Sequence, residues 1–233
     1  MQRRATTITM LLLLAFALCA PASEVIDRIV AIVNGKLILQ SDVQEEARIE
    51  GFLAGQQPSD FKPEELRTVV DRMIDRQLVH EQMRTVREVA TTSQAVERRM
   101  KQLRQTLGKS AESDAEWQKT LNYAGVTEEE LRSHFADEVQ TMRFLEARLR
   151  PQIQVDPAAI EAYYREKLLP EMQKSGEKEA PLAEVSPRIR EVLIEQKLDE
   201  SLTQWLKSLR EQSSIRVPAP IGSNAAVPAP QGK

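Results

Sequence analysis

The residues that could do chemistry in this sequence are few and dispersed. Its two histidines, His80 and His134, lie in stretches of helical periodicity among mainly charged neighbours, where an exposed histidine is usually inert. The sequence has no H-E-x-x-H, G-x-S-x-G, G-x-G-x-x-G or phosphate-loop motif. Its acids have Lys or Arg three or four residues away, a pattern typical of solvated helix faces. We therefore expect no catalytic residue, no cofactor-binding residue and no metal ligand.

The first residues have the three parts of a secretory signal peptide. Arg3 and Arg4 give a positively charged start, and an apolar run follows over residues 8–18. Residues 20–22 then supply the small-x-small pattern of a cleavage site. At roughly 11 residues, the apolar run is well below the ~20 that a membrane-spanning helix needs. We expect residues 1–22 to be removed and the remaining chain to be periplasmic, without stable membrane insertion.

The only cysteine, Cys19, lies within this segment. A lipoprotein signal would need a small residue before the cysteine, whereas Leu18 is large, so lipid anchoring is the weaker interpretation. Without Cys19 the chain has no thiol for disulfides or for zinc. Removal of residues 1–22 takes away two arginines and no acid, which leaves 30 basic and 35 acidic residues and a formal charge of −5. Such a chain is a poor match for nucleic acid.

The first structural signal after the signal segment is a β-hairpin. Residues 29–33 and 36–39 are apolar or β-branched, and Asn34-Gly35 separates them. Asn-Gly supplies the two positive φ angles of a type I′ turn, which makes this a strong hairpin signal. Both runs are apolar on both faces, so we expect other elements to cover each side.

The rest of the sequence has helical periodicity, abundant charge and few glycines or aromatics, which predicts a mainly α-helical fold. Ser41 with Gln44, and Thr127 before three glutamates, are expected helix N-caps. Pro170 should end or kink its helix. The expected helices lie near residues 42–54, 63–89, 93–107, 112–123, 128–150, 157–170 and 186–212.

Five methionines after the signal segment fall on helical stripes. They are Met73, Met83, Met100, Met142 and Met172. Flexible methionine side chains can accept varied apolar partners, which favours a binding groove. Core packing is the more common role, and the pattern leaves both open at each position.

The C-terminal part of the sequence divides into three segments. Residues 173–184 are polar with a glycine and a proline, which predicts a linker. Residues 185–217 predict a last helix followed by a short strand, Ile215-Arg216-Val217. The Pro/Ala-rich residues 218–233 have too little apolar surface to fold, so we expect a disordered tail.

Five segments, read in order, resemble the N-terminal domain of the SurA-type periplasmic chaperones, which are related to the PrsA-type secreted foldases. They are IDRIVAIVNGKLILQSDV, VVDRMIDRQLVHEQ, GVTEEELRSHFADEVQTMRFLEARL, VDPAAIEAYY and VSPRIREVLIEQKLDESLTQWLKSLREQSSIRV. The resemblance covers most of residues 24–217, and its most specific part is the hairpin that runs into Ser-Asp-Val.

This resemblance implies a multi-helix SurA-N-like domain over residues 23–172, which residues 185–217 complete. It also implies that Ile215 and Val217 pair with the hairpin and that Trp205 lies in the core. Family members usually carry parvulin prolyl isomerase domains at the position of residues 173–184. A domain needs at least ~50 residues, so no parvulin fits there.

The function that the resemblance implies is an ATP-independent periplasmic chaperone, with no cofactor. It would bind unfolded secreted or outer-membrane proteins through apolar helical grooves. Two alternatives stay open, a peptidyl-prolyl isomerase by kinship and an envelope assembly adaptor. The resemblance assigns no client-binding residue.

Overall fold

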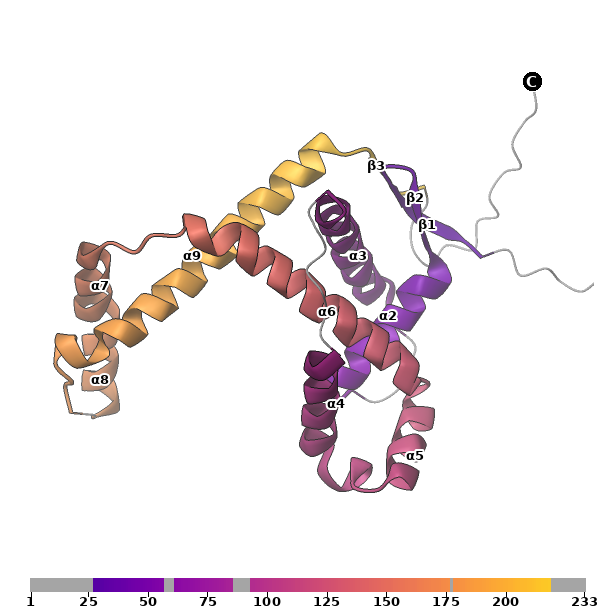
Figure 1. Cartoon of the computed structure of the whole chain (residues 1–233), viewed down its shortest axis with the longest axis horizontal. Coiled ribbons are helices and arrows are strands. Elements are labelled where there is room, and N and C mark those ends of the chain that lie inside the picture. The colour runs from indigo at the N-terminus through magenta and orange to yellow at the C-terminus, as the bar shows by residue number, and fades with distance from the viewer. Residues whose placement is uncertain (1–26, 57–60, 86–92, 177, 219–233) are drawn as a thin grey trace, which may run out of the picture.

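The structure is a computed structural model that describes residues 27–56, 61–85, 93–176 and 178–218 (Figure 1). These residues form a mainly helical fold with one small antiparallel sheet. The elements are β1 (Ile29–Val33), β2 (Lys36–Leu39), α2 (Gln40–Leu53), α3 (Pro63–Met83), α4 (Ser93–Leu107), the 3₁₀ helix η1 (Gly108–Ala111), α5 (Asp114–Ala124), α6 (Glu128–Leu149), the 3₁₀ helix η2 (Arg150–Gln152), α7 (Pro157–Tyr163), the π-helix η3 (Tyr164–Leu168), α8 (Leu169–Ser175), α9 (Leu182–Gln212) and β3 (Ile215–Arg216). The expected signal peptide lies outside the described residues, as does the expected tail apart from Pro218.

The expected hairpin is confirmed. Asn34 and Gly35 have φ angles of 48° and 85°, and β1 pairs antiparallel with β2. β3 pairs antiparallel with the other side of β1, which gives the strand order β2-β1-β3. The backbone N–H of Ser214 donates to Oδ1 of Asn34 at 2.8 Å, so the turn residue also fixes the start of β3.

Val217, which was expected to pair with the hairpin, does not. β3 ends at Arg216, and the Val217 side chain is 55% exposed. Pro218 follows and has no N–H with which to continue the ladder, so the strand ends there. Ile215 does pair, with Val33, and is half-buried against the adjacent core.

One expected N-cap is confirmed and the other is wrong. Glu130 donates its backbone N–H to the hydroxyl of Thr127 (3.1 Å), and its carboxylate accepts from the N–H of Thr127 (2.6 Å). At the start of α2, however, Ser41 is already helical. The N–H of Leu39 donates to the carboxylate of Asp42 at 3.0 Å. The backbone N–H and the hydroxyl of Ser41 both donate to the carboxylate of Asp27, so the Ser41 side chain does not cap the helix.

The expected linker over residues 173–184 is shorter than predicted. α8 continues to Ser175, and Gly176 follows it with a φ of 72°. α9 begins at Leu182. The connection between the two helices is therefore residues 176–181.

The start of the last helix at Ser186-Pro187 is also wrong, because Pro187 lies inside α9. Leu182 lies three residues before Val185, and Val185 lies four residues before Ile189. The two side chains therefore extend the apolar face of α9 by one turn. They are half-buried, while Ile189 is buried. The packing of this turn compensates for the backbone hydrogen bond that α9 lacks at Pro187.

Two other helix ends differ from expectation. Pro170 does not end its helix. The chain passes through the π-helix η3 and continues as α8 with Pro170 in the first turn, where a missing N–H costs little. α3 ends at Met83, whereas the expected end near Val89 lies outside the described residues.

The apolar side chains of the described residues form two cores, and α2 contributes to both. The first core joins the sheet, α2, α3 and the end of α9, and its buried members are Val30, Ala31, Val33, Ile38, Val43, Ala47, Val69, Val70, Ile74, Leu78 and Leu209. The second joins α2, α4, α5 and α6, and its buried members are Ile49, Phe52, Val96, Met100, Ala111, Trp117, Leu121, Val126, Leu131 and Phe135. Trp205 is half-buried at the edge of the first core.

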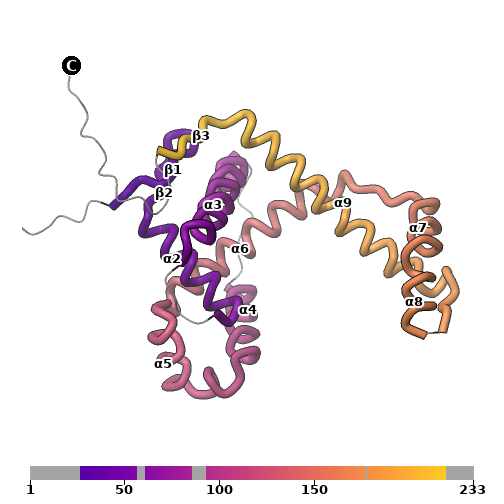
Figure 2. Tube along the Cα trace, turned by 180° about the vertical axis from the view of Figure 1, so that it is seen from behind, coloured from indigo at the N-terminus to yellow at the C-terminus, as the bar shows by residue number. Residues whose placement is uncertain are grey.

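The molecule is open and elongated (Figure 2). α7 and α8 lie at one end, and the sheet lies at the other. α9 runs the whole distance between them and crosses α6 on the way. α4 and α5 extend from the middle of the molecule as a separate lobe. α9 is therefore the element that joins the outlying helices to the first core.

Candidate functional site

Both histidines lie where α2, α3 and α6 meet. Nε2 of His80 is 2.7 Å from Oδ1 of Asp137. Nδ1 of His134 is 3.6 Å from Oε1 of Glu46. Arg76 links the two pairs, because its guanidinium contacts Glu46 and lies 3.6 Å from Asp137. The His134 side chain is only 13% exposed, so the expectation of an exposed histidine is wrong there.

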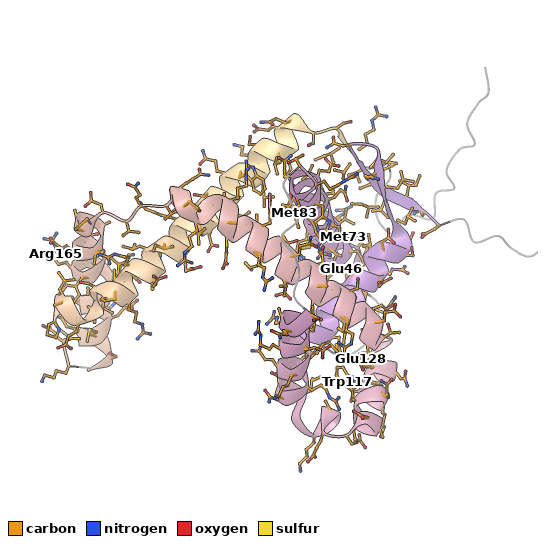
Figure 3. All side chains as sticks on the ribbon, viewed as in Figure 1. Glu46, Met73, Met83, Trp117, Glu128 and Arg165 are labelled. Atoms are coloured by element: carbon orange, nitrogen blue, oxygen red, sulfur yellow. The ribbon has the colours of Figure 1, made fainter. Side chains whose placement is uncertain are left out.

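Glu46 is the buried centre of this junction cluster of five residues (Figure 3). Burial on its own would raise the pKa of Glu46, but its contacts with His134 and Arg76 outweigh burial and lower the pKa to about 2. Burial likewise disfavours the charged form of Arg76, yet Glu46 raises the pKa of Arg76. A carboxylate that is fully ionised at neutral pH is a poor proton shuttle. The geometry thus suits holding three helices together better than acid–base chemistry.

The contact between His80 and Asp137 is short but poorly directed. Nε2 of His80 is buried and forms no aligned hydrogen bond with any described residue, in spite of the 2.7 Å separation. A hydrogen bond needs a nearly linear N–H···O arrangement, so we describe this contact as electrostatic. Within the described ranges, no group of three or more His, Cys, Asp or Glu side chains is placed to hold a metal ion. In the same ranges, no helix is long and apolar enough to cross a membrane.

The five methionines have different environments. Met100 is buried in the second core, and Met73 is half-buried against the first. Met83 and Met172 are half-buried, and Sδ of Met83 lies 4.0 Å from the hydroxyl oxygen of Thr141. Met142, on α6, has a side chain that is 54% exposed. These positions do not form one methionine-lined groove, so that part of the binding hypothesis rests on Met142 alone.

α9 offers a longer apolar surface. Although it has 31 residues, only Ile189 and Leu209 are buried, 20 residues apart. Between them lie five apolar residues that are only partly buried. We call them the α9 stripe: Ile194, Leu198 and Leu202 recur every four residues on one face, and Val192 and Leu193 lie on other sides of the same helix. A helix of this length would usually bury such residues against a core.

The α9 stripe lies beside the C-terminal part of α6. The Phe144 and Trp205 rings are 6.2 Å apart, and the Arg148 guanidinium lies 4.9 Å from the Trp205 ring centre. Further along, Nζ of Lys197 donates to the carbonyl of Gln154 at 2.7 Å. These contacts hold α9 along one side and leave the stripe half-covered.

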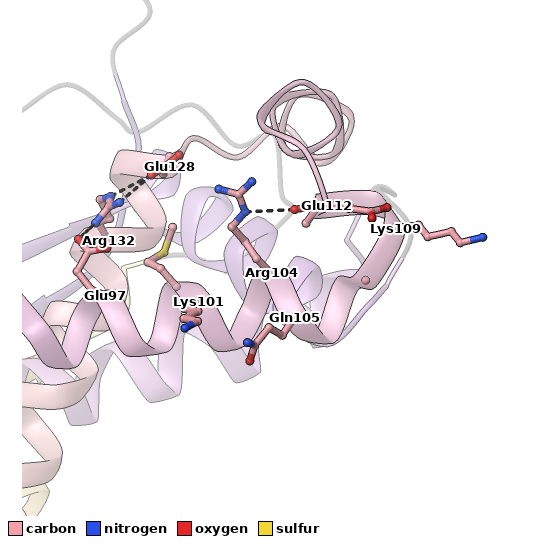
Figure 4. Close-up of a pocket in the computed structure, with 11 residues that line it drawn as sticks. Glu97, Lys101, Arg104, Gln105, Lys109, Glu112, Glu128 and Arg132 are labelled. Carbon is pink, nitrogen blue, oxygen red and sulfur yellow. Dashed lines mark hydrogen bonds and ion pairs between the residues drawn. The ribbon is translucent and has the colours of Figure 1, made fainter.

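Two hollows lie elsewhere in the described part of the chain. The larger has a volume of about 690 Å³ and lies between α4, η1 and the start of α6 (Figure 4). The smaller, about 320 Å³, lies between α2 and the first turns of α3. Both are lined by more charged and polar side chains than a site for an apolar small molecule would have.

Comparison of the chain with models of protein families gives no match. Comparison with curated proteins gives no match either.

Proposed function

We propose that this protein is an ATP-independent periplasmic chaperone that binds unfolded secreted or outer-membrane polypeptides. The observation that carries the proposal is the α9 stripe, five apolar residues left only partly buried on a long, well-anchored helix. The order of the sequence segments, which resembles SurA-type chaperones, adds support. Apolar side chains that a fold leaves partly uncovered in one region are typical of interaction sites.

The apolar area of the α9 stripe limits how tightly a client can bind. A client side chain that buries roughly 100 Å² of apolar surface gains about 2.5 kcal/mol before entropic costs. Two or three such contacts give at most micromolar affinity once ordering of the client is subtracted. A weak and repeated contact of this kind can be released without a nucleotide cycle, which is consistent with an ATP-independent chaperone.

The proposal is tested by light scattering of a denatured outer-membrane barrel protein diluted into buffer. We expect the purified protein to slow aggregation at low molar excess. The variant Leu198→Gln/Leu202→Gln should lose most of this effect, because it removes two apolar residues from the stripe. The matched control is Glu200→Gln/Lys207→Gln, which changes two exposed α9 residues outside the stripe.

Melting curves by circular dichroism establish that both variants are folded. Unchanged scattering at tenfold excess of the wild-type protein would contradict the chaperone proposal. If both variants lose the slowing of aggregation equally, the α9 stripe is not the surface that binds the client. Stable co-purification with a single native partner would favour the assembly adaptor instead.

A further inference from the structure

Arg148, in the last turn of α6, has no acidic partner among the residues that the structure describes. Its guanidinium lies over the Trp205 ring of α9, 4.9 Å from the ring centre, and no described carboxylate lies within ion-pair distance of it. The residues three and four positions from Arg148 are uncharged: Phe144, Leu145, Pro151 and Gln152. The same positions around Trp205 are also uncharged: Ser201, Leu202, Ser208 and Leu209. The positive charge of Arg148 is therefore not compensated locally.

The charged residues of α9 that contact this end of α6 do not supply the missing partner. Glu191 and Glu195 both pair with Arg150, at 3.1 and 3.8 Å. Nζ of Lys197 donates to the carbonyl of Gln154. Together with Arg148, the side chains in these contacts between α6 and α9 carry three positive charges and two negative ones (Figure 1). One further carboxylate would balance them.

The contact with Trp205 positions the Arg148 guanidinium without using its hydrogen-bond donors. The Trp205 ring lies 6.2 Å from the ring of Phe144, which is buried. A guanidinium above an aromatic ring keeps its N–H groups directed outward in its own plane. Two of these groups match the two oxygens of a carboxylate, which is a strong and directional pairing. Arg148 is exposed, so a carboxylate from outside the protein can reach it.

Arg148 lies beside one end of the α9 stripe. The three stripe residues that share one face recur every four residues, which is ~6 Å along the helix axis. Alternate side chains of an extended chain are about 6.7 Å apart, so they can follow the same row. Beyond Trp205, α9 packs into the first core, where Leu209 is buried. An extended segment that lies along the stripe therefore meets the first core at Trp205, beside Arg148.

We propose that this end of the stripe binds the C-terminal end of an unfolded polypeptide. Arg148 holds the terminal carboxylate, and Leu198 and Leu202 contact the last apolar side chains. The terminal carboxylate fits better than an acidic side chain within the segment, because the open surface of the stripe ends where Arg148 lies. This inference names the client segment, and it rests on the proposed chaperone function.

The experiment is fluorescence anisotropy with the full protein and a peptide of about ten residues, labelled at its N-terminus, with leucine at every second position. The peptide is prepared with a free terminal carboxylate and as the terminal amide, which lacks that charge. We expect the free acid to bind about three- to tenfold more tightly. Arg148→Gln should remove this preference and leave binding of the amide unchanged. Raised salt should reduce the preference.

The control variant is Arg165→Gln, which removes an exposed arginine at the far end of the molecule (Figure 3). It should keep the preference for the free acid. If Arg148 only supports the Trp205 ring, Arg148→Gln weakens both peptides equally, and this result would overturn the proposal. Equal binding of the two peptides to the wild-type protein, or no binding of either, would overturn it too.

A third peptide tests the assignment to the chain end. It is an amide with an aspartate inside the segment, and we expect it to bind no better than the plain amide. Binding as tight as that of the free acid would contradict the terminal site.

The two proposals can fail separately. If Leu198→Gln/Leu202→Gln weakens both peptides while Arg148→Gln changes neither, the stripe binds clients without a terminal site. If the free acid binds through Arg148 but the protein does not slow aggregation, the terminal site stands and the chaperone proposal fails.

Discussion

The burial of Glu46 gives one side chain a large share in the packing of α2, α3 and α6. Its carboxylate contacts Arg76 and His134 while it is almost fully removed from water. Removing one partner of a buried ion pair leaves the other charge uncompensated, which costs more than the pair itself contributes. This residue therefore matters more for stability than exposed pairs such as Arg150 with Glu191.

Glu46→Gln should lower the free energy of unfolding at pH 7 by about 1–3 kcal/mol. The pKa of Glu46 is about 2 in the folded chain against 4.5 ordinarily, so its stabilisation is present above pH 4.5 and is lost as the pH falls towards 2. Urea unfolding at pH 7 and pH 3 should therefore show a smaller difference between wild type and variant at pH 3. Glu200→Gln, on an exposed surface, is the control. A difference that is independent of pH would contradict this account.

The junction cluster was not predictable from sequence, and the reason is separation along the chain. Glu46 and His134 are 88 residues apart, and His80 and Asp137 come from different helices. A local signal does exist. Glu46 falls on the apolar face of α2, three residues after Val43, and an acid at such a position indicates a buried partner.

At the scale of elements, the sequence predicted the turns and helix caps that depend only on neighbouring residues. Asn34-Gly35 fixed the hairpin, and Thr127 fixed the start of α6, because a turn or a cap needs only neighbouring residues. The start of α9 depended instead on packing of Leu182 and Val185, so the proline signal at residue 187 misplaced it. Strand β3 was predicted from its β-branched residues, whereas it ends at Arg216, shortly before Pro218, which has no N–H with which to continue the ladder.

Thr127→Ala tests the N-cap of α6. It removes the hydroxyl that accepts from the N–H of Glu130 and should lower the free energy of unfolding by about 1 kcal/mol. Thr127→Ser, which keeps the hydroxyl, should retain most of the wild-type free energy of unfolding. Equal stability of wild type and alanine variant in urea would show that the cap contributes nothing.

At the scale of the molecule, α2 is shared by two cores, so the cores should not unfold separately. Val43 and Ala47 belong to the first core, and Ile49 and Phe52 to the second, within one helix. Loss of either core would leave a continuous α2 with half of its buried face exposed. Cooperative unfolding is the expected result.

The two tryptophans report on the two cores individually. Trp117 is buried in the second core, and Trp205 lies at the edge of the first. Fluorescence of the variants Trp205→Phe and Trp117→Phe therefore follows one core each. We expect each variant's fluorescence midpoint in urea to coincide with its own midpoint by circular dichroism. Midpoints that differ within one variant would show that the lobe of α4 and α5 unfolds independently.

The connection at residues 176–181 has a consequence for how the chain could be reordered. β1 and β3 are hydrogen-bonded neighbours, so the described ends of the chain belong to one small sheet, while the end of α8 and the start of α9 lie at the opposite end of the molecule. A short linker between the present ends, with new ends opened at the α8–α9 connection, would leave both cores intact. Such a circular permutant would begin with α9 and finish with α8, and it would make the long helix the first element to leave the ribosome.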